Sequence, residues 1–561
     1  MKKFQIPFLL LFFFISINEA VAQDVIWTRV LAGHEEEYGN AINIDKDGNV
    51  IIAGSFRDIC YGGNFALFSS GSTDAFIEKI SPTGTRLWTK QFGNGNADHA
   101  HSIASDSEGN IYLAGTFTGT VNFGGGNLSS SVTNSSFFLL KIGPDGTVLW
   151  RKTVPGYSSH RPKLTVDKND NLFITGIFFG ERDFGSFNID SDDGCGFIAK
   201  INNSNGNVVW VTQFGSGTTL IPGTPVAVNV TTSNFITDTA GNIFLTGCFR
   251  GHGRFGSQNF LIANSDSNAY IMKMNSSGTI LWTKRYTGPT EGTSIVIDSN
   301  NNIYTAGKYI ATANINNTTY TSPGFYSVYL QKLDADGNLT WFKNYFLNTT
   351  ESFEAHPQLA IDSSTNLFFK CLFGWDKTVT FENQTFSSMI STNPNVLKQQ
   401  ILASFDGNGN NLWVNQYESP NDNIQFGVLT DKTTNIAVDQ TGLYFTSGSS
   451  MFNDVNYSQQ SGANIFAAKL SLPYILNNDN PTRNSEVSLF PNPTSGNVTV
   501  ALPKTYNAIQ ARIYNTFGQL VSTENFKDAS QMSIELRGES GLYLIEIQSG
   551  MTKIIKKVIK L

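Results

Sequence analysis

The sequence predicts an all-β protein built mainly from one repeated unit of four short strands. Three observations lead to this prediction: a richness in aromatic residues and glycine, a regular spacing of tryptophans, and strand-like segments bounded by turn residues in every copy. Of the 561 residues, 40% are hydrophobic, 12% are aromatic and 15% are charged, and 51 are glycines. A chain with this much apolar surface can offset the entropy lost on ordering, so disorder is excluded for most of its length.

The charge balance predicts no nucleic-acid partner. The chain carries 45 acidic and 38 basic residues, which gives a formal net charge of −7 at pH 7. Binding to nucleic acid requires a clustered excess of Lys and Arg, and this balance does not provide one.

The first 22 residues have the layout of a secretory signal peptide. A positive start, Met1-Lys2-Lys3, precedes an apolar run over residues 7–17, and Ala20-Val21-Ala22 supplies the small residues that signal peptidase requires. The apolar run is 11 residues long, whereas roughly 20 residues are needed to span a bilayer. We therefore expect cleavage after Ala22, an exported chain, and no transmembrane segment in the mature protein.

Tryptophan recurs at a nearly constant interval along most of the chain. Seven of the eight tryptophans are separated by 59 to 72 residues, and from the second onward each follows a similar turn, as in SPTGTRLW and GPDGTVLW. The seven are Trp27, Trp88, Trp150, Trp210, Trp282, Trp341 and Trp413. A fixed period of this kind indicates a repeat architecture, and no copy contains a segment with helical periodicity.

Between the tryptophans lies a second landmark, an aspartate followed by a short turn and an apolar strand. The first copy reads DKDGNVIIAG, and the aspartates are Asp45, Asp106, Asp167, Asp238, Asp298, Asp362 and Asp439. The segments NAINID, NVIIAGSF, DAFIEKI and RLWTKQF of the first copy read as strands, because they are rich in β-branched and aromatic residues and are bounded by Gly, Asn and Asp. Four antiparallel strands in a repeat of this length describe one blade of a β-propeller.

The two ends of the repeat region predict how the ring closes. Residues 26–31 match the fourth strand of a blade, whereas the last copy ends with a third strand at residues 465–470. We therefore expect residues 26–31 to complete the last blade beside residues 465–470, a circular (Velcro) closure that leaves no gap through which the ring could open. The predicted fold is a seven-bladed β-propeller over residues 23–474, with residues 1–22 as the signal peptide.

The repeat resembles the bacterial β-propeller repeat family, whose copies run A-x-x-I-x-x-D-x-x-G-N-x-Y-x-x-G and then D-A-F-x-x-K. The resemblance covers about residues 24–474 and implies the propeller fold. It implies no particular activity, because propellers carry unrelated functions on one scaffold.

The composition changes after Pro473. Residues 475–486 are polar and are predicted to be a linker between domains. Three segments follow, at residues 489–500, 511–521 and 541–561, in which apolar and polar residues alternate. Because this period of two is that of a half-buried strand, residues 487–561 are predicted to form a small β-sandwich.

These three segments resemble the type A C-terminal sorting domain of type IX secretion substrates. The matching positions are Pro491, Asn492, Pro493 and Gly496, then Gly518 and Val521, then Gly541 and Tyr543, and finally Lys553, Lys556 and Lys557. The resemblance implies passage through the periplasm and then across the outer membrane, with the type IX machinery as partner and either surface anchoring or release as the outcome. A generic carbohydrate-binding sandwich is the alternative.

Two interpretations stay open for the four cysteines, Cys60, Cys195, Cys248 and Cys371. Disulfides are permitted in an exported chain, but the sequence does not choose among the three ways of pairing four cysteines. Alternatively, the four are buried free thiols that serve as small apolar residues. Their irregular spacing, without C-x-x-C, speaks against a zinc site.

The repeated aspartates could suggest calcium sites. A calcium loop of the EF-hand kind needs Gly at its sixth position and Glu at its twelfth. Counted from Asp45, those positions hold Val50 and Phe56. We therefore favour the interpretation that each aspartate accepts backbone hydrogen bonds in a turn.

Three residues at one repeat offset form the candidate ligand site. His99, His160 and Glu291 each lie seven residues before a repeat aspartate, where the chain enters the innermost strand of its blade. We hypothesise that they contribute to a ring at one mouth of the channel that binds a metal or a polar ligand, since two histidines and a carboxylate suit zinc in kind. Solvated loop residues are the alternative.

The sequence predicts no cofactor and no catalytic residue. The first hypothesis for function is an exported, non-catalytic binding protein at the cell surface or in the medium, which presents its loops to a glycan or a protein. The alternative is a secreted hydrolase or lyase that acts on polysaccharide or peptide through the channel, with His99, His160 and Glu291 as its candidates. A third reading is a structural part of an extracellular matrix or motility surface.

Overall fold

The computed structural model describes residues 25–33, 37–62, 65–130, 136–156, 161–191, 194–215, 229–260, 266–347, 356–373, 378–381, 384–387, 398–419, 436–448, 451–452, 455–456, 465–472, 488–490, 494–506, 508–515, 519–538, 541–549 and 552–560. The predicted signal peptide and the predicted linker lie outside these residues. The chain divides into two compact units, Met1–Leu472 and Pro473–Leu561. The described residues hold strands and turns but no helix, so the prediction of an all-β fold is confirmed for them.

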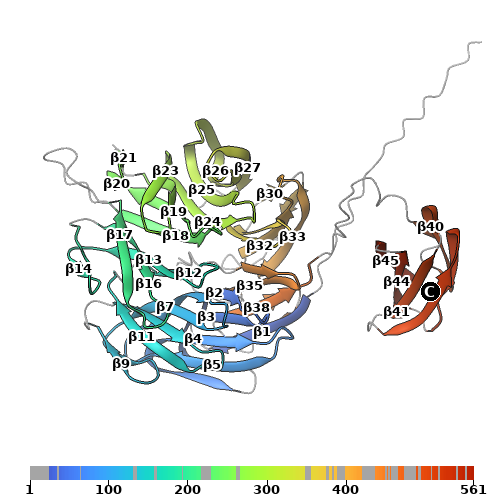
Figure 1. The fold of residues 1–561 in the computed structure, drawn as a ribbon, viewed down its shortest axis with the longest axis horizontal. Helices are drawn as coiled ribbons and strands as arrows, with labels where there is room; N and C mark the ends of the chain where they lie inside the picture. The colour runs from blue at the N-terminus through green and yellow to red at the C-terminus, as the bar shows by residue number, and fades with distance from the viewer. Residues whose placement is uncertain are drawn as a thin grey trace, which may run out of the picture. The chain divides into compact units, whose positions relative to one another are not determined.

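The first unit is built from antiparallel four-stranded groups (Figure 1). In six of these groups the strands are paired in their order along the chain. The seventh combines strands from the two ends of the unit. The first three sheets contain β2 (Tyr38–Ile44), β3 (Val50–Tyr61), β4 (Ala66–Ile80) and β5 (Arg86–Phe92); β6 (His99–Ser105), β7 (Ile111–Phe117), β10 (Ser136–Ile142) and β11 (Val148–Val154); and β12 (Lys163–Val166), β13 (Leu172–Phe178), β16 (Cys195–Ile201) and β17 (Val208–Phe214).

The next three sheets repeat the same order. They contain β18 (Asn229–Thr237), β19 (Ile243–Arg250), β22 (Asn268–Met274) and β23 (Ile280–Tyr286); β24 (Thr290–Ile297), β25 (Ile303–Ile315), β26 (Thr318–Leu333) and β27 (Leu339–Leu347); and β28 (Gln358–Ile361), β29 (Leu367–Phe373), β32 (Lys398–Phe405) and β33 (Asn411–Ser419). In all six sheets the Trp-bearing strand is the fourth.

The seventh group joins the two ends of the repeat region. Strands β34 (Ile436–Asp439), β35 (Gly442–Gly448) and β38 (Ile465–Leu470) are followed in the sheet by β1 (Val25–Gly33). Strand β1 pairs antiparallel with β38 from Val25 opposite Leu470 to Leu31 opposite Ile465. The pairing predicted for residues 26–31 and 465–470 is therefore present. The end of β1 also pairs with β3, which joins this group to the first sheet.

Apolar side chains fill the space between each sheet and the next. All seven residues of β7 are buried, because neighbouring sheets cover both of its faces. Seven clusters of buried residues each combine side chains from two consecutive sheets, and one of them joins Ile52 and Phe76 of the first sheet to Tyr444 and Ile465 of the last. The first strands also contact one another in a cycle, β2 to β6, β12, β18, β24, β28, β34 and back to β2. Of these strands, β2, β12, β18 and β24 are labelled near the centre of Figure 1.

Short hairpins between the second and third strands add a layer that the sequence did not predict. They are β8 (Thr120–Asn122) with β9 (Asn127–Ser129), β14 (Arg182–Asp183) with β15 (Asn188–Ile189), β20 (Gly253–Phe255) with β21 (Gln258–Phe260), β30 (Thr378–Phe381) with β31 (Gln384–Ser387), and β36 (Met451–Phe452) with β37 (Val455–Asn456). Four of them contribute a buried phenylalanine to a core between sheets: Phe123, Phe184, Phe255 and Phe381.

The second unit packs two sheets against each other. One contains β39 (Ser488–Phe490), β40 (Asn497–Tyr506) and β43 (Ala529–Glu535), and the other contains β42 (Leu520–Phe526), β41 (Ile509–Asn515), β44 (Gly541–Ser549) and β45 (Thr552–Lys560). Their common core includes Val500 and Ile534 from the first sheet and Ile513 and Ile545 from the second. Alternate residues of β41 are buried, as the predicted period of two requires.

The four cysteines lie in the interior of the first unit. Cys60, Cys195, Cys248 and Cys371 are all buried and form no disulfide, in agreement with the interpretation that they are buried thiols. Burial raises the pKa of the Cys371 thiol to about 12. In the described part of the chain, no helix has the length and apolar character that a membrane crossing requires.

Candidate functional site

Each repeat aspartate closes the turn between the first and second strands of its sheet. Asp45 Oδ1 accepts hydrogen bonds from the backbone N–H groups of Asp47 and Asn49, both at 2.9 Å. The same two backbone bonds are made by Asp106, Asp167, Asp238, Asp298 and Asp362. The turn interpretation of these aspartates is confirmed, and their carboxylates act in the scaffold.

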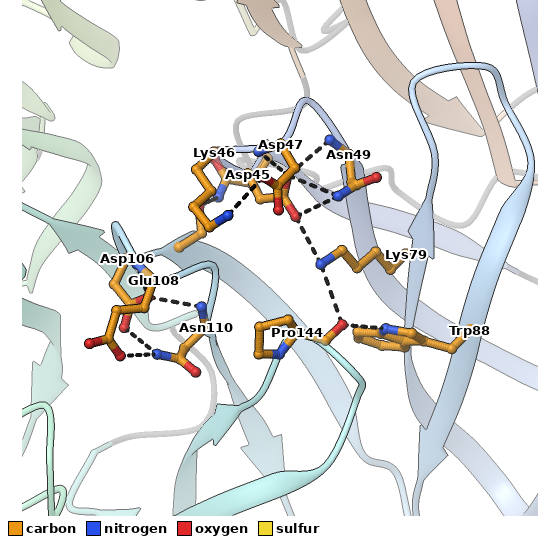
Figure 2. A network of polar contacts seen from close by, with 12 residues as sticks. Asp45, Lys46, Asp47, Asn49, Lys79, Trp88, Asp106, Glu108, Asn110 and Pro144 are labelled. Carbon is orange, nitrogen blue, oxygen red and sulfur yellow. Dashed lines mark hydrogen bonds and ion pairs between the residues drawn. The ribbon is translucent and has the colours of Figure 1, made fainter.

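A lysine and a tryptophan connect this turn to the next sheet (Figure 2). Lys79 Nζ lies 2.8 Å from Asp45 Oδ2 and donates a hydrogen bond to the carbonyl oxygen of Pro144 at 3.4 Å. Trp88 Nε1 donates to the same oxygen at 3.0 Å. Burial by itself would raise the pKa of Asp45, but hydrogen bonds from Lys79 and Asn49 outweigh it and hold that pKa below its ordinary value.

The repeat tryptophans lie against turn glycines of the following sheet. At Gly146 φ is 87°, and a Cβ there would lie 3.1 Å from the Trp88 ring. The same relation pairs Trp27 with Gly84, Trp150 with Gly206, Trp210 with Gly278, Trp282 with Gly337 and Trp341 with Gly409. Glycine is therefore required in this turn both for its backbone conformation and for the neighbouring indole. These tryptophans therefore pack between one sheet and the next.

The two candidate ring residues that the structure describes lie on different first strands. His99 begins β6, Glu291 lies on β24, and His160 is outside the described residues. Strand β6 contacts the first strands β2 and β12, whereas β24 contacts β18 and β28. Within the part of the chain that the structure describes, no group of three or more His, Cys, Asp or Glu residues is placed to hold a metal ion. The three-residue ring stays a hypothesis.

Glu291 has a cationic partner on the adjacent strand of its own sheet. Its Oε2 atom lies 3.3 Å from Lys308 Nζ, and the Lys308 side chain is only 4% exposed. The two residues face each other in the register of β24 and β25. Glu291 therefore has a clear role within its sheet as the ion-pair partner of a buried lysine.

A β-bulge places one extra residue in several of the first strands. The residues skipped in the pairing of the first and second strands are Asn40, His101, Ser233 and Thr293. Their side chains are buried. Asn40 Nδ2 donates to the Ala100 carbonyl oxygen at 2.9 Å, and Thr293 Oγ1 donates to the Pro357 carbonyl oxygen at 2.7 Å. The bulge thus directs a polar side chain toward the first strand of the next sheet.

The bulge histidine of the second sheet belongs to a polar group that offset counting missed. The rings of His99 and His101 are stacked with their centroids 5.7 Å apart. His101 Nε2 lies 3.1 Å from Thr116 Oγ1, whereas Nδ1 has no hydrogen-bond partner among the described residues. Lys163 begins β12, the next first strand along the cycle, and Arg161 precedes this strand.

Arg161 influences the pKa of both histidines, and Lys163 influences that of His101. Burial, together with the Arg161 guanidinium, lowers the pKa of His99 to about 4. Burial also holds the pKa of His101 well below its usual range, with added contributions from Arg161, His99 and Lys163. Both imidazoles are therefore neutral near pH 7.

The sorting-motif residues that the structure describes lie in or next to strands of the second unit. Gly496, with φ of 147°, precedes β40, and Gly541, with φ of 156°, begins β44. Tyr543 is buried, and its hydroxyl group donates a hydrogen bond to the Arg537 carbonyl oxygen at 3.3 Å. Lys556 is opposite Ile545 in the pairing of β45 with β44. Pro491, Asn492, Pro493 and Gly518 lie outside the described residues, and Lys557 is placed only as part of β45.

Two family models match parts of the chain. Residues 87–119 match the β-propeller repeat, and residues 488–561 match the secretion system C-terminal sorting domain. Residues 488–561 are a type IX sorting domain. The sorting domain marks the chain for export and, in general terms, for the outer membrane or the cell surface.

Similar proteins and structures share low sequence identity with the chain. An uncharacterized WD repeat-containing protein of Acanthamoeba polyphaga mimivirus is 22% identical over 74% of this chain, and the match spans 36% of that protein's length. A protein of unknown function from Bacteroides caccae has a TM-score of 0.31 at 12% identity, with 71% of this chain and 96% of that chain covered. A polysaccharide lyase has a TM-score of 0.40 at 11% identity, with 79% of this chain and 93% of that chain covered.

Proposed function

We propose that this chain is an exported, non-catalytic binding protein at the cell surface or in the medium. Its ligand-binding part is a closed seven-bladed β-propeller, and its sorting domain directs it through the type IX machinery. The match of residues 488–561 to the sorting-domain family carries the export part of this proposal. The proposed boundaries are residues 1–22 for the signal peptide, 23–474 for the propeller, 475–486 for the linker and 487–561 for the sorting domain.

Three contacts support the closed ring. Strand β1 pairs with β38, the first strands contact one another in a cycle that returns to β2, and one apolar cluster combines side chains of the first and last sheets. A ring closed by hydrogen bonds between its first and last strands has no gap between blades at which it could open. Such a scaffold holds the residues at its channel mouths in fixed positions, which favours selective binding.

The use of the repeated polar residues supports binding over catalysis. The aspartates close turns, the third-strand lysines reach carbonyl groups, as Lys273 reaches Ala335 at 2.9 Å, and the tryptophans dock on turn glycines. These residues therefore build the scaffold. The polar side chains left for ligands are those that differ between copies, above all at the bulge of the second sheet.

Two experiments test the proposal. In the native bacterium, deletion of residues 487–561 is expected to leave the protein in the periplasm, whereas the full chain reaches the surface or the medium; equal surface levels would contradict the sorting role. For the ligand, the purified chain without residues 1–22 is applied to glycan and protein arrays. Turnover of a polysaccharide or peptide panel by the same preparation would favour the alternative of a secreted hydrolase or lyase.

A further inference from the structure

We propose that the outer strand of the second sheet binds a carboxylate or sulfate group through the guanidinium group of Arg151. The residue lies on β11, and β11 contacts β9 of the short hairpin formed by β8 and β9 (Figure 1). The inference rests on the proposed binding function and deepens it, because it gives the ligand a chemical class.

Arg151 occupies a position that carries no charge in the other copies of the repeat. It directly follows Trp150, the repeat tryptophan of the second sheet. The residues that follow the other six repeat tryptophans are Thr28, Thr89, Val211, Thr283, Phe342 and Val414. A blade therefore needs no charge at this position. Since the residues that build the scaffold recur from copy to copy and this arginine does not, its charge favours a role outside the scaffold.

The turn of the hairpin beside Arg151 differs from the equivalent turns in the opposite sense. It ends with Gly126, and in the register of the other short hairpins the equivalent residues are Phe187, Gln258, Gln384 and Val455. In the fourth sheet Gln258 Oε1 accepts a hydrogen bond from the Thr283 N–H group at 2.8 Å. In the third sheet Phe187 and Val211 belong to one apolar cluster. In those two sheets a side chain from the turn thus packs on the residue after the tryptophan.

In the second sheet the guanidinium group takes the space of the missing side chain. A Cβ atom on Gly126 would clash with Nη2 of Arg151 and lie 2.9 Å from its Cζ atom, and a Cβ atom on Gly125 would lie 3.6 Å from Nη1. Because φ of Gly126 is 140°, the backbone also disfavours a side chain there. Gly125 is exposed and Arg151 is half-buried, so a solute can reach the guanidinium group from solvent.

The Arg151 cation has no counter-ion in the part of the chain that the structure describes. Its Nε atom is buried and makes no hydrogen bond to a described residue, and no ion pair of the described residues includes it. Asp145 is the one acidic residue in the sequence from 111 to 156, and its carboxylate accepts two hydrogen bonds from Thr147, at 2.9 and 2.8 Å. Buried polar atoms without partners are rare, and each one calls for an unseen water, ion or ligand.

A guanidinium group recognises oxyanions by geometry as well as by charge. Its paired N–H groups match two oxygens of a carboxylate or a sulfate. Neutral sugars offer hydroxyl groups without the charge that would compensate this cation. The neighbouring Lys152 donates to Asn207 Oδ1 at 2.9 Å and so belongs to the border with the third sheet. Uronic acids and sulfate esters both carry the required group, and the experiment below separates these two sources.

Titration calorimetry on the protein lacking residues 1–22 tests the proposal with three polysaccharides: alginate, which carries carboxylates, dextran sulfate, and neutral dextran. We expect binding of alginate, of dextran sulfate or of both, and none of dextran; the polymer that binds identifies the source. Arg151→Thr should weaken this binding by about tenfold or more. It should also fold, because Thr89 and Thr283 hold the same position in two other sheets. Lys152→Thr is the matched control, since it removes the adjacent cation and Thr212 holds that position in the third sheet; it should bind as the wild type does.

Three results would overturn the proposal. They are an absence of binding by both anionic polymers, equal binding of dextran, and an equal loss of affinity in Arg151→Thr and Lys152→Thr, which would indicate attraction to positive charge in general. If Arg151→Thr does not fold, as judged from its tryptophan fluorescence, Arg151→Met against Arg151→Lys replaces it, and the charge-conserving variant should retain more affinity. An absence of anion binding in a protein for which the arrays identify a ligand would refute this site and leave the proposed binding function standing.

Discussion

The ion pair between Arg29 and Glu78 gives the sharpest test of the seam between the first and last sheets. Arg29 lies on β1, and its Nε and Nη2 atoms donate to Glu78 Oε1 at 2.9 and 2.6 Å. Glu78 lies on β4 of the first sheet, and its side chain is 0% exposed, against 18% for Arg29. Removal of Arg29 therefore leaves a buried carboxylate without its main cation.

The expected cost follows from these contacts. Breaking a buried ion pair by removing one partner typically costs about 3–5 kcal/mol of unfolding free energy. Two charge-assisted hydrogen bonds, each contributing roughly 1.5–3 kcal/mol, give a similar range. Burial already raises the pKa of Glu78 in spite of Arg29. Without Arg29 that pKa rises further. A carboxyl group whose pKa is higher in the folded than in the unfolded chain stabilises the fold at pH values below the unfolded pKa. This stabilisation is lost as pH rises through the folded pKa. The loss in Arg29→Ala should therefore be larger at pH 8 than at pH 5.

The assay is urea denaturation followed by tryptophan fluorescence. All eight tryptophans precede residue 473, so the signal reports only on the first unit. Arg29→Ala should lower stability by the amount above, and Arg29→Met with Glu78→Gln should recover most of it, because no buried charge remains. Lys46→Ala, which removes the exposed pair with Asp47 at 2.7 Å, is the control and should change nothing measurable. Purely additive effects of the substitutions at Arg29 and Glu78 would refute the seam described here.

Three further predictions concern the repeat. Gly146→Ala should destabilise the first unit by about 1–3 kcal/mol more than Gly185→Ala, because φ is 87° at both positions but only Gly146 faces Trp88, whereas a Cβ on Gly185 would meet nothing within 4 Å. Burial raises the pKa of Asp98 to about 7. Its protonated form therefore stabilises the fold, and this stabilisation is lost as pH rises through that value. Between pH 5 and pH 8 the free energy of unfolding of the wild type should fall by about 2–3 kcal/mol more than that of Asp98→Asn. Asp106→Ala should cost about 2–4 kcal/mol through lost turn hydrogen bonds, whereas EDTA should leave the melting temperature unchanged, and a drop with EDTA would restore the calcium interpretation.

Much of the architecture could be predicted because the same Trp and Asp positions recur in every copy of the repeat. One Trp or one Asp carries little information, but recurrence at a fixed interval identified the strands and the incomplete last copy. The pairing of β1 with β38 followed from counting strands at the two ends of the repeat region. The role of the aspartates followed from turn chemistry.

The hairpins between second and third strands were missed for a physical reason. Strands such as β14 and β15 contain two residues each, so they have no periodicity that pattern analysis could recognise. Their signal was present in another form, a Phe-Gly pair at Phe123, Phe184 and Phe255. In the structure these phenylalanines are buried between sheets, and the following glycines have positive φ.

The candidate site could be predicted only in part. Counting back from the aspartates correctly placed His99 and Glu291 on first strands, but the count treats every strand as regular. A bulge inserts a residue, breaks the regular alternation and turns that residue toward the neighbouring strand. For that reason the count did not select His101.

The most direct test of the closed ring is a disulfide between its first and last strands. Thr28 on β1 and Ala468 on β38 are Cα partners, and opposite residues of antiparallel strands have Cα atoms about 4.5–5.5 Å apart, within disulfide range. In Thr28→Cys with Ala468→Cys, peptide mapping of the oxidised monomer should recover the linked pair. Thr28→Cys with Thr446→Cys is the control, because β38 separates these residues by about two strand spacings, or roughly 9–10 Å. Failure of the first pair to link, or links formed only between two molecules, would contradict a ring closed within one chain.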